Sequence, residues 1–297
     1  MRIVRTVNDL RAALAAARRG SATIGLVPTM GALHDGHLSL IARARTECDV
    51  VVVSLFVNPS QFDEGEDLER YPRRERQDAD LAANAGADFL FAPSIDEVYP
   101  PGFATAVEVL GVSDRLEGAA RGPEHFRGVS TVVTKLLGMA MPDVAYFGQK
   151  DAQQVIVIRR LVSDLNLPVR IQTCPTVREP DGLAMSSRNA RLSPQERSQA
   201  RALPDALKAA ARRAGEGERS AEALLDAARG ALLARGVEPE YLELVYPETF
   251  EPCEELAREA LLVLAASIGR TRLIDNAVLR PSPVPACRQT PSRKAVA

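Results

Sequence analysis

The stretch Val50-Val51-Val52-Val53-Ser54-Leu55-Phe56-Val57 decides the fold of this chain of 297 residues. It is a continuous apolar run, which is typical of a strand buried on both faces, as the central strands of a parallel sheet are. Other short apolar runs alternate with helical patterns along the first half of the chain, at residues 23–28, 88–91, 144–147 and 169–176. This alternation predicts an α/β domain with a Rossmann-like, doubly wound parallel sheet, whose strands are joined by crossover helices.

The connecting helices are predicted where apolar residues recur every three or four positions. They fall at residues 36–46, 74–85, 129–141 and 152–165. One more strand is predicted at residues 104–110, after the turn-forming sequence Tyr99-Pro100-Pro101-Gly102.

A different pattern begins at about residue 193. Two alanine-rich helices are predicted at residues 194–214 and 220–235, with the turn Gly215-Glu216-Gly217 between them. Strands follow at residues 241–245, 261–266 and 271–274. These elements predict a smaller C-terminal α+β domain that can carry a lid over a site on the first domain.

We therefore divide the chain into a larger domain, residues 1–180, and a smaller domain, residues 181–280. The final segment, residues 281–297, is rich in proline and basic residues and has no periodicity, so disorder is predicted there. The sequence contains no internal repeats.

The overall composition argues against several classes of protein. Hydrophobic residues make up 46% of the chain and charged residues 26%, the balance of an ordinary globular protein. The formal net charge of −2 argues against the broad basic surface of a nucleic-acid-binding protein. No apolar run approaches the roughly 20 residues that span a bilayer, and the first residues lack a signal-peptide apolar block. We expect a cytoplasmic protein without membrane or nucleic-acid partners.

The four cysteines are far apart in the sequence, at Cys48, Cys174, Cys253 and Cys287. They form no Cys-x-x-Cys pair and no Cys/His spacing of the kind that builds zinc sites or disulfide frameworks. We predict reduced thiols with at most a packing role.

Two of the three histidines occur in His34-Asp35-Gly36-His37, where the first predicted strand gives way to a helix. A helix N-terminus in this position presents free backbone N–H groups and a partial positive charge, which favour phosphate. Gly36 leaves room for a nucleotide to approach the backbone. Both imidazoles can donate hydrogen bonds to phosphate oxygens whose charge grows as pyrophosphate leaves. The alternative is that His34 and His37 are exposed loop residues beside a helix cap formed by Asp35.

A second polar motif, Asp181-Gly182-Leu183-Ala184-Met185-Ser186-Ser187-Arg188-Asn189, lies between the last predicted strand of the first domain and the C-terminal helices. Two hydroxyls and a guanidinium on a glycine-containing segment can clamp triphosphate oxygens. Alone, the same sequence is equally typical of a solvated linker.

Two further polar motifs directly follow predicted strands. Phe147-Gly148-Gln149-Lys150-Asp151 offers a cation for phosphate in Lys150 and a close backbone approach at Gly148, although a solvated lysine in a turn is the alternative. Gln61 follows the central strand in Asn58-Pro59-Ser60-Gln61. Because the carboxyl ends of parallel strands meet at one edge of a sheet, all four motifs are expected to face one crevice. The residues alone therefore predict adenylyl transfer, with the substrate unspecified.

Several stretches of the chain, taken in order, resemble the pantothenate synthetase family, the pantoate:β-alanine ligases. The resemblance runs from about residue 23 to residue 276, and the combination of motifs is highly specific. The first or last motif alone would indicate only the superfamily of HIGH-type nucleotidyl transferases. The motifs are Val27-Pro28-Thr29-Met30-Gly31-Ala32-Leu33-His34-Asp35-Gly36-His37, Phe56-Val57-Asn58-Pro59-Ser60-Gln61-Phe62, Tyr71-Pro72-Arg73, His125-Phe126-Arg127-Gly128-Val129, Phe147-Gly148-Gln149-Lys150-Asp151 and Met185-Ser186-Ser187-Arg188.

The resemblance implies an enzyme that condenses pantoate with β-alanine in two steps. ATP and pantoate first give a pantoyl-adenylate and pyrophosphate, and β-alanine then displaces AMP to form the amide bond of pantothenate. Magnesium is implied as the companion of ATP. The resemblance also implies a homodimer formed through the larger domain.

The resemblance further assigns roles to individual residues. Contacts with ATP are implied for Met30, Gly31, Ala32, Leu33, His34, Asp35, Gly36, His37, Gly148, Gln149, Lys150, Asp151, Val177, Met185, Ser186, Ser187 and Arg188. Catalytic roles are implied for His34, His37, Lys150, Ser186, Ser187 and Arg188, with His37 as the proton donor. Gln61 is implied to hold pantoate and β-alanine, and Gln154 to hold pantoate. No metal ligands are assigned.

The chain departs from the family pattern at some positions. Gln149 and Ala152 replace a common glutamate and a common aromatic residue, which is expected to change local packing or charge. Gln77 precedes Asp78 where acidic residues are common. The segment Arg121-Gly122-Pro123-Glu124-His125 is one residue longer than usual, which leaves the match of Arg121 open.

Other functions remain compatible with these residues. A nucleotidylyltransferase on the same fold would keep the AMP on its product. Gln61 and Gln154 favour a carboxylic acid substrate instead, but only weakly without the resemblance. A non-catalytic sensor would bind ATP without turnover, and His37 would then affect affinity alone. A tRNA synthetase is disfavoured because the chain is short, nearly neutral and has no evident anticodon-binding region.

Overall fold

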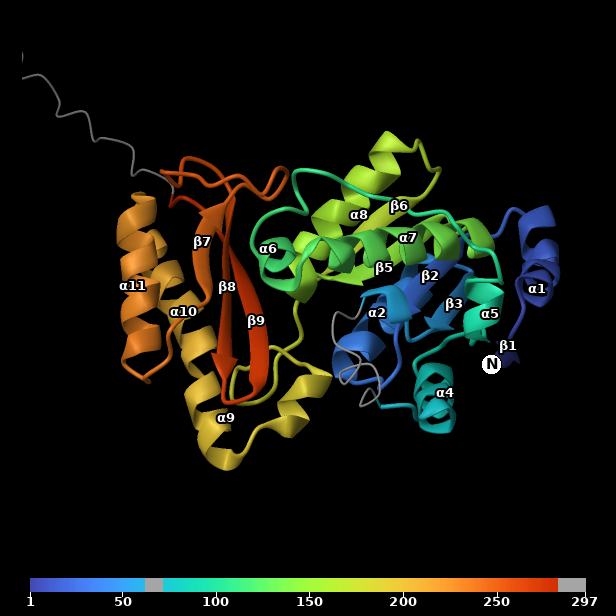
Figure 1. Ribbon diagram of the computed structural model, residues 1–297, viewed down its shortest axis with the longest axis horizontal. Coiled ribbons are helices and arrows are strands. Elements are labelled where there is room, and N and C mark those ends of the chain that lie inside the picture. The colour runs from blue at the N-terminus through green and yellow to red at the C-terminus, as the bar shows by residue number, and fades with distance from the viewer. Residues whose placement is uncertain (62–71, 283–297) are drawn as a thin grey trace, which may run out of the picture.

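The fold is described by a computed structural model, which covers residues 1–61 and 72–282 (Figure 1). The predicted fold class is confirmed, because a six-stranded parallel sheet is flanked by helices and is followed by a three-stranded antiparallel sheet with helices of its own. Phe62, Tyr71 and residues 283–297, which include most of the segment predicted to be disordered, lie outside the described residues. Among the described helices, none is long and apolar enough to cross a membrane.

The strands of the parallel sheet are arranged in the order β1-β4-β3-β2-β5-β6. They are β1 (Arg2–Val4), β2 (Ile24–Thr29), β3 (Val50–Leu55), β4 (Phe89–Phe91), β5 (Val144–Gly148) and β6 (Arg170–Cys174). From β2 the chain moves outward to β3 and β4 on one side, and later to β5 and β6 on the other. The carboxyl ends of β2 and β5 meet at this change of direction, where doubly wound sheets usually bind their ligands.

Helices cover both faces of the parallel sheet, as the apolar β3 sequence predicted. They are α1 (Val7–Arg19), α2 (Asp35–Glu47), α4 (Glu75–Asn84), α5 (Ile95–Val98), α6 (Glu117–Arg121), α7 (Pro123–Ala140) and α8 (Ala152–Asp164). Val52 packs into the core under α1, α7 and α8. Its neighbours Val51 and Val53 pack into the opposite core under α2 and α4.

The C-terminal part has its own core. Its helices and strands are α9 (Pro194–Ala200), α10 (Ala202–Gly215), α11 (Ala221–Leu233), β7 (Tyr241–Val245), β8 (Ala260–Ile268) and β9 (Thr271–Leu279). β8 is the central strand and pairs antiparallel with both neighbours. Leu207 of α10, Leu224 of α11 and Leu264 of β8 belong to one buried cluster, which also includes Leu183. A smaller cluster, with Ile156 of α8 and Leu261 of β8, joins the two parts.

The prediction of a strand at residues 104–110 is wrong. The segment is irregular and lies over α7, where the Val107 N–H donates a hydrogen bond to Thr131 Oγ1 at 2.9 Å. Val109 is buried in the core beneath it. The alternating apolar residues therefore reflect packing against a helix, and a helix side chain takes the hydrogen bond that a neighbouring strand would have taken.

Two helix predictions also need correction. The helix predicted at residues 129–141 begins earlier, because Pro123 occupies its first turn, where a missing N–H costs nothing. The helix predicted at residues 194–214 is broken at Arg201 into α9 and α10. Pro204 has no N–H to donate, and its ring clashes with the carbonyl of Ala200 in a continuous helix, so the break falls between them.

Candidate active site

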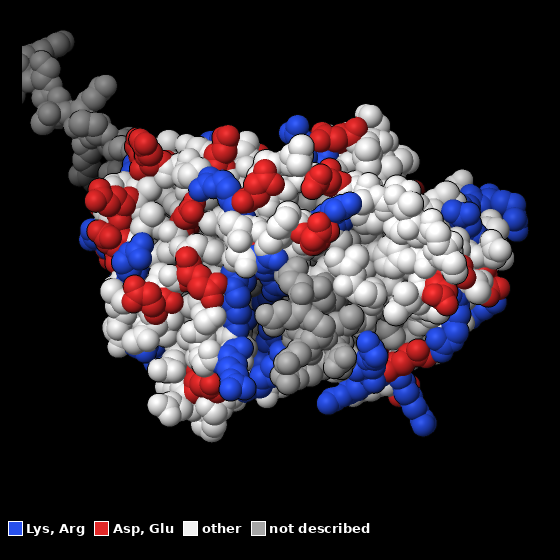
Figure 2. All heavy atoms as spheres, viewed as in Figure 1, with Lys and Arg blue, Asp and Glu red and all other residues white. Residues whose placement is uncertain are grey.

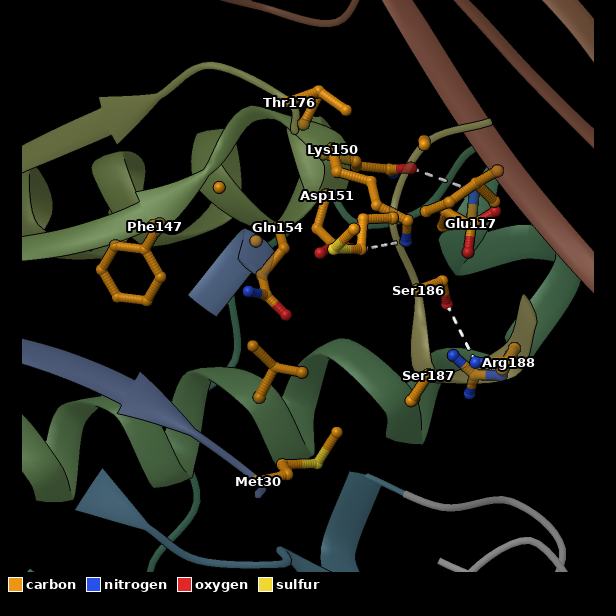
Figure 3. Close-up of a pocket in the computed structure, with 18 of the residues that line it drawn as sticks. Met30, Glu117, Phe147, Lys150, Asp151, Gln154, Thr176, Ser186, Ser187 and Arg188 are labelled. Atoms are coloured by element: carbon orange, nitrogen blue, oxygen red, sulfur yellow. Dashed lines mark hydrogen bonds and ion pairs between the residues drawn. The ribbon is translucent and has the colours of Figure 1, made fainter. Parts of the chain in front are cut away.

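A cavity of about 300 Å³ opens where the ends of β2 and β5 meet the C-terminal part. Figure 3 shows Met30, Lys150, Gln154 and the 186–188 segment around the same space, although they come from distant parts of the sequence. Figure 2 shows Lys and Arg side chains gathered along a furrow in the middle of one face, between the C-terminal part and the rest. Cations placed in a cavity favour anionic ligands.

The turn after β2 is held by a buried carboxylate. Gly31 and Ala32 have left-handed backbone, with φ angles of 92° and 51°. Asp78 of α4 is 2% exposed and accepts hydrogen bonds from the N–H groups of Ala32, at 3.0 Å, and Leu33, at 2.8 Å. A Cβ atom at Gly31 would lie 2.8 Å from Leu55 Cδ1, so glycine is needed for its space as well as its φ angle. This turn fixes the point at which α2 begins.

The two histidines of the first motif lie together at the N-terminus of α2. Their ring centroids are 4.1 Å apart, and the His34 N–H donates to His37 Nδ1 at 3.4 Å. The proton of a neutral His37 is therefore on Nε2. A Cβ at Gly36 would lie 2.9 Å from His34 Cε1. Gly36 thus makes room for the His34 ring, whereas the sequence suggested that it makes room for a nucleotide.

Burial keeps both imidazoles uncharged at pH 7. Burial, followed by the neighbouring His34, lowers the pKa of His37 to about 3. Burial, followed by the charge of Lys150, lowers the pKa of His34. His34 Nδ1 is buried and has no hydrogen-bond partner within the described residues, so a polar ligand atom would satisfy it.

The end of β5 contributes the next group of residues, through the short 3-10 turn η2 (Gln149–Asp151). The Lys150 side chain is 19% exposed, and its Nζ lies 3.6 Å from Asp151 Oδ1, which is a loose ion pair. No described atom lies within 4 Å of a Cβ built at Gly148, so the backbone there borders open space. A phosphate or ribose can approach this turn closely.

Gln149, which replaces the glutamate common in the family, has a clear structural role. Its Nε2 donates to Asn276 Oδ1 at 3.2 Å. Asn276 of β9 in turn donates from Nδ2 to the backbone oxygens of Gln149, at 2.9 Å, and Lys150, at 3.0 Å. A glutamate has no proton to donate to Asn276 when ionised. Gln149 therefore ties the first part of the chain to the C-terminal sheet.

Gln61 lies in the 3-10 turn η1 (Pro59–Gln61), and its amide orientation is fixed by neighbours. Asn58, which is 1% exposed, donates from Nδ2 to Gln61 Oε1 at 3.0 Å, and Tyr99 donates to Asn58 Oδ1 at 2.8 Å. Gln61 Nε2 consequently faces Met30 Sδ, at 3.1 Å. His125 Nδ1 donates to the Gln61 backbone oxygen at 3.1 Å. The cavity thus has an amide donor suited to an oxygen atom of an acid.

Gln154 lies in the first turn of α8, and its amide group faces the cavity (Figure 3). Its neighbour Gln153 is 4% exposed and has a different function. Gln153 accepts a hydrogen bond from the Glu117 N–H at 3.0 Å and donates to the backbone oxygens of Val112 and Arg115, at 2.9 and 2.8 Å. It therefore holds the start of α6 against α8.

The 177–191 segment closes the cavity from the opposite side. The Met185 N–H donates to the Val177 backbone oxygen at 2.9 Å, and Leu183 is 2% exposed. Ser186 Oγ accepts a hydrogen bond from the Arg188 N–H at 3.2 Å, which starts the 3-10 turn η3 (Ser187–Arg191). The second motif is thus a hydrogen-bonded loop whose Ser186, Ser187 and Arg188 line the cavity, so the alternative of a solvated linker is wrong.

Most of the predicted site residues line this cavity. They are Met30, His34, Gly36, His37, Gln61, Gly148, Lys150, Asp151, Gln154, Val177, Met185, Ser186, Ser187 and Arg188. Others for which ATP contacts were predicted do not line it, namely Gly31, Ala32, Leu33, Asp35 and Gln149. The first three form the turn on Asp78, Asp35 is exposed, and Gln149 bonds to β9. Their contacts with ATP stay predictions.

Several cavity residues were missed because they are not part of a recognisable motif. Thr176 is one of these, and its buried Oγ1 has no hydrogen-bond partner within the described ranges. Asn58 is different, because it belongs to the motif that follows β3, and only its role was missed. Glu117 and Arg121, whose match to the family was left open, reach the cavity from α6, and Tyr241, Arg272 and Asn276 reach it through the packing of the C-terminal sheet.

The fold and the site together define a class of protein. A doubly wound sheet with a His-x-Gly-His turn at its change of direction, faced by a serine- and arginine-containing loop, characterises the HIGH-type nucleotidyl transferases. In this chain both motifs line one cavity.

Comparisons with known proteins narrow this class to one family. The family model described as pantoate-β-alanine ligase matches residues 2–278. The pantothenate synthetase of Cereibacter sphaeroides is 54% identical over 275 residues, which cover 92% of this chain and 98% of the relative. That of Rhizorhabdus wittichii is 52% identical over 284 residues, covering 95% of this chain and 100% of the relative.

Solved structures agree. The pantothenate synthetase of Thermus thermophilus matches with a TM-score of 0.89 and 49% identity, covering 95% of this chain and 100% of that one. The pantoate-β-alanine ligase of Francisella tularensis, solved in complex with beta-gamma ATP and β-alanine, matches with a TM-score of 0.78 and 35% identity, covering 94% of this chain and 97% of that one. The chain therefore belongs to the pantoate-β-alanine ligase family, as the sequence motifs implied.

Proposed function

We propose that this protein uses ATP to condense pantoate with β-alanine, through a pantoyl-adenylate intermediate. The observation that carries the proposal is the single cavity in which the 34–37 turn and Lys150 face the 185–188 segment. Membership of the family indicates that the two substrates that are joined are pantoate and β-alanine. The Francisella tularensis relative, which was solved with beta-gamma ATP and β-alanine, supports ATP and β-alanine as ligands of this cavity.

In the first step, a carboxylate oxygen of pantoate attacks the α-phosphorus of ATP, and the bond from that phosphorus to pyrophosphate breaks. Negative charge grows on the phosphate oxygens, where preorganised donors stabilise it most effectively. His37 donates a hydrogen bond from Nε2 as a neutral ring, and Lys150 contributes a positive charge. Pyrophosphate leaves as an anion, so His37 need not transfer its proton.

The two glutamines orient the acid for this attack. Gln61 presents its Nε2 donor to the cavity because Asn58 occupies its oxygen. Gln154 approaches the same space from α8. Amide groups of this kind can hold the hydroxyl and carboxylate oxygens of pantoate, and such positioning supplies a large part of the rate acceleration in reactions between two bound substrates.

In the second step, the neutral amine of β-alanine attacks the acyl carbon, and the bond from that carbon to the AMP oxygen breaks. AMP departs, and one amine proton passes to water. The acyl-adenylate is prone to hydrolysis, so the 185–188 segment and the C-terminal part that carries it serve to exclude water.

Magnesium would enter as a companion of ATP. The described residues contain no group of three or more His, Cys, Asp or Glu side chains able to hold a metal on their own. Mg²⁺ usually binds through one or two carboxylates together with substrate phosphates and water. Asp151, 49% exposed beside Lys150, fits such a ligand, whereas Glu117 and Asp275 accept hydrogen bonds from arginines. The ion would neutralise phosphate charge.

The direct test is a product assay with ATP, Mg²⁺, pantoate and β-alanine. We expect AMP and pyrophosphate in equal amounts, both dependent on pantoate. No AMP above a control without pantoate would contradict the proposal. Pyrophosphate without AMP would identify a nucleotidylyltransferase, and ATP binding without either product would identify a sensor.

We also propose a homodimer and a cytoplasmic location, both because of the family resemblance. Sedimentation velocity at micromolar concentration should give twice the mass of one chain, and a sedimenting monomer would contradict the dimer. Fractionation of the native cells should recover the protein with the cytosol.

A further inference from the structure

One residue that lines the cavity has a role that the motifs did not assign. We propose that Arg121 binds the carboxylate of β-alanine and that Glu117 positions its guanidinium. This inference rests on the proposed function, because it concerns the second substrate of that reaction.

The location of Arg121 follows from its neighbours on either side. Glu117, at the other end of α6, is connected through Gln153 to the start of α8, where Gln154 faces the cavity. His125, in the first turn of α7, bonds to the backbone of Gln61. Arg121 lies between these anchors and lines the cavity. Its segment is therefore attached on one side to α8, which carries Gln154, and on the other side to Gln61.

The second substrate needs a cation to bind its carboxylate. β-Alanine attacks the acyl group with its amine, and its carboxylate lies two methylene groups away. Four basic side chains from the described residues line the cavity: Arg121, Lys150, Arg188 and Arg272. Lys150 and Arg188 belong to the motifs proposed to bind phosphate. Arg272 is engaged with carboxylates, because it donates to Glu117 at 2.7 and 2.9 Å and to Glu240 at 2.6 Å.

Arg121 is held in a way that leaves its terminal nitrogens suited to a ligand. Its Nε donates to Glu117 Oε2 at 3.1 Å, and the side chain is 27% exposed. The two remaining nitrogens form one edge of a planar fork, which matches the geometry of a carboxylate. An arginine anchored through Nε binds without first ordering a long flexible side chain, which favours affinity.

Glu117 is well suited to position Arg121. Its carboxylate is 7% exposed and also accepts hydrogen bonds from both terminal nitrogens of Arg272 and from the Tyr241 hydroxyl, at 2.8 Å. Arg272 and Tyr241 belong to the C-terminal sheet, whereas Glu117 and Arg121 belong to α6. The position of the proposed carboxylate site is therefore set by both parts of the chain (Figure 1).

The test separates the two steps of the reaction in an Arg121→Met variant. Pantoate-dependent exchange of pyrophosphate into ATP reports the first step and does not require β-alanine. The full reaction is then measured with β-alanine and with β-alaninamide, which has the amine but no carboxylate. Arg115→Met is the control, because Arg115 is also an arginine ion-paired to a glutamate, Glu243 at 2.6 Å, but does not line the cavity.

We expect Arg121→Met to leave the exchange rate within about twofold of the parent and to raise the KM for β-alanine about 10- to 100-fold. The preference for β-alanine over β-alaninamide should fall by a similar factor, whereas Arg115→Met should keep it. Glu117→Gln should weaken the same preference less. Because the preference is a ratio, it can be read even if a variant is partly unfolded.

Two results would overturn the assignment of Arg121. One is an unchanged preference for β-alanine. The other is an equal loss of exchange and of the full reaction, which would indicate a structural role or a role in binding pantoate. If the parent enzyme itself showed no pantoate-dependent exchange, the proposed function would fail, and this inference with it.

Discussion

The two sides of the cavity are held in place by different parts of the molecule. The 30–37 turn is anchored by a helix of the parallel-sheet part, α4, where Asp78 accepts two backbone hydrogen bonds. The 177–191 segment is anchored in the C-terminal part. There Leu183 is buried in the core, and Arg178 bonds to Asp275 at 2.7 and 3.0 Å. Asp275 is 3% exposed, so this pair is a firm attachment.

This difference shows where motion can occur. Each side of the cavity is hydrogen-bonded to its own part, so we expect the 177–191 segment to move with the C-terminal part. The distance between the two sides depends on contacts between the parts, such as those of Gln149 with Asn276 and of Glu117 with Arg272. We predict that any closure over the nucleotide moves the C-terminal part together with its loop.

The largest effect is expected for His37→Ala, on the side of the cavity formed by the 30–37 turn. Loss of a preorganised donor to the transferring phosphate should lower kcat about 100- to 1000-fold, while the Kd for ATP changes little. Steady-state kinetics and calorimetric titration with ATP would measure the two quantities. Equal losses in both would show that His37 only binds the ground state, as in a sensor.

Substitution of Asp78, which anchors the 30–37 turn, should have the next largest effect. Asp78→Asn removes the charged acceptor of two backbone N–H groups and should lower the free energy of unfolding by about 2–3 kcal/mol. Asp80→Asn is the matched control, because Asp80 lies exposed on the same helix and should change stability by less than about 0.5 kcal/mol. Urea denaturation compares the two variants. Similar stabilities would mean that the turn does not depend on Asp78.

Lowering the pH should destabilise the folded protein, because His37 is buried in its neutral form. Burial lowers the pKa of His37 in the folded protein to about 3, below its ordinary value of 6.5. As pH falls below 6.5 the unfolded chain takes up this proton first, so folded-state stability is lost between about pH 6.5 and pH 3. At pH 5 the loss due to His37 should reach about 2 kcal/mol. Urea unfolding of the parent and of His37→Asn should diverge by that amount from pH 7 to pH 5. Parallel curves would contradict the burial of this ring.

The smallest effect is expected at the contact between the two sides. Gln149→Glu replaces a donor to Asn276 Oδ1 with a carboxylate, which should cost about 1 kcal/mol of stability and loosen the attachment of β9. Gln149→Met, which removes the donor without adding a charge, separates the two causes. A Gln149→Glu variant as stable as the parent would show that the family's common glutamate is equally acceptable here.

Two kinds of feature could be predicted from the sequence: elements marked by a repeating apolar pattern, and polar motifs that directly follow a strand. The apolar run of β3 predicted a sheet covered on both faces, and the four motifs at strand ends and in the loop meet in one cavity. The false strand at residues 104–110 shows the limit of periodicity, because a chain packed over a helix can alternate in the same way. The break at Arg201 could have been read from Pro204.

The contacts that could not be predicted lie between the parallel sheet with its helices and the C-terminal part. Arg272 and Asn276 reach the cavity only because β9 is packed beside η2 and α6, and no local sequence pattern encodes that packing. Such contacts between distant residues require coordinates.

The central claim is that one nucleotide is held by both sides of the cavity at once. A crystal structure of the protein incubated with ATP, Mg²⁺ and pantoate, without β-alanine, tests it most directly. We predict density for pantoyl-adenylate, with its phosphate within hydrogen-bonding distance of His34 or His37 on one side and of the 186–188 segment on the other. A nucleotide bound to the first side alone, with no contact from residues 185–188, would contradict the account.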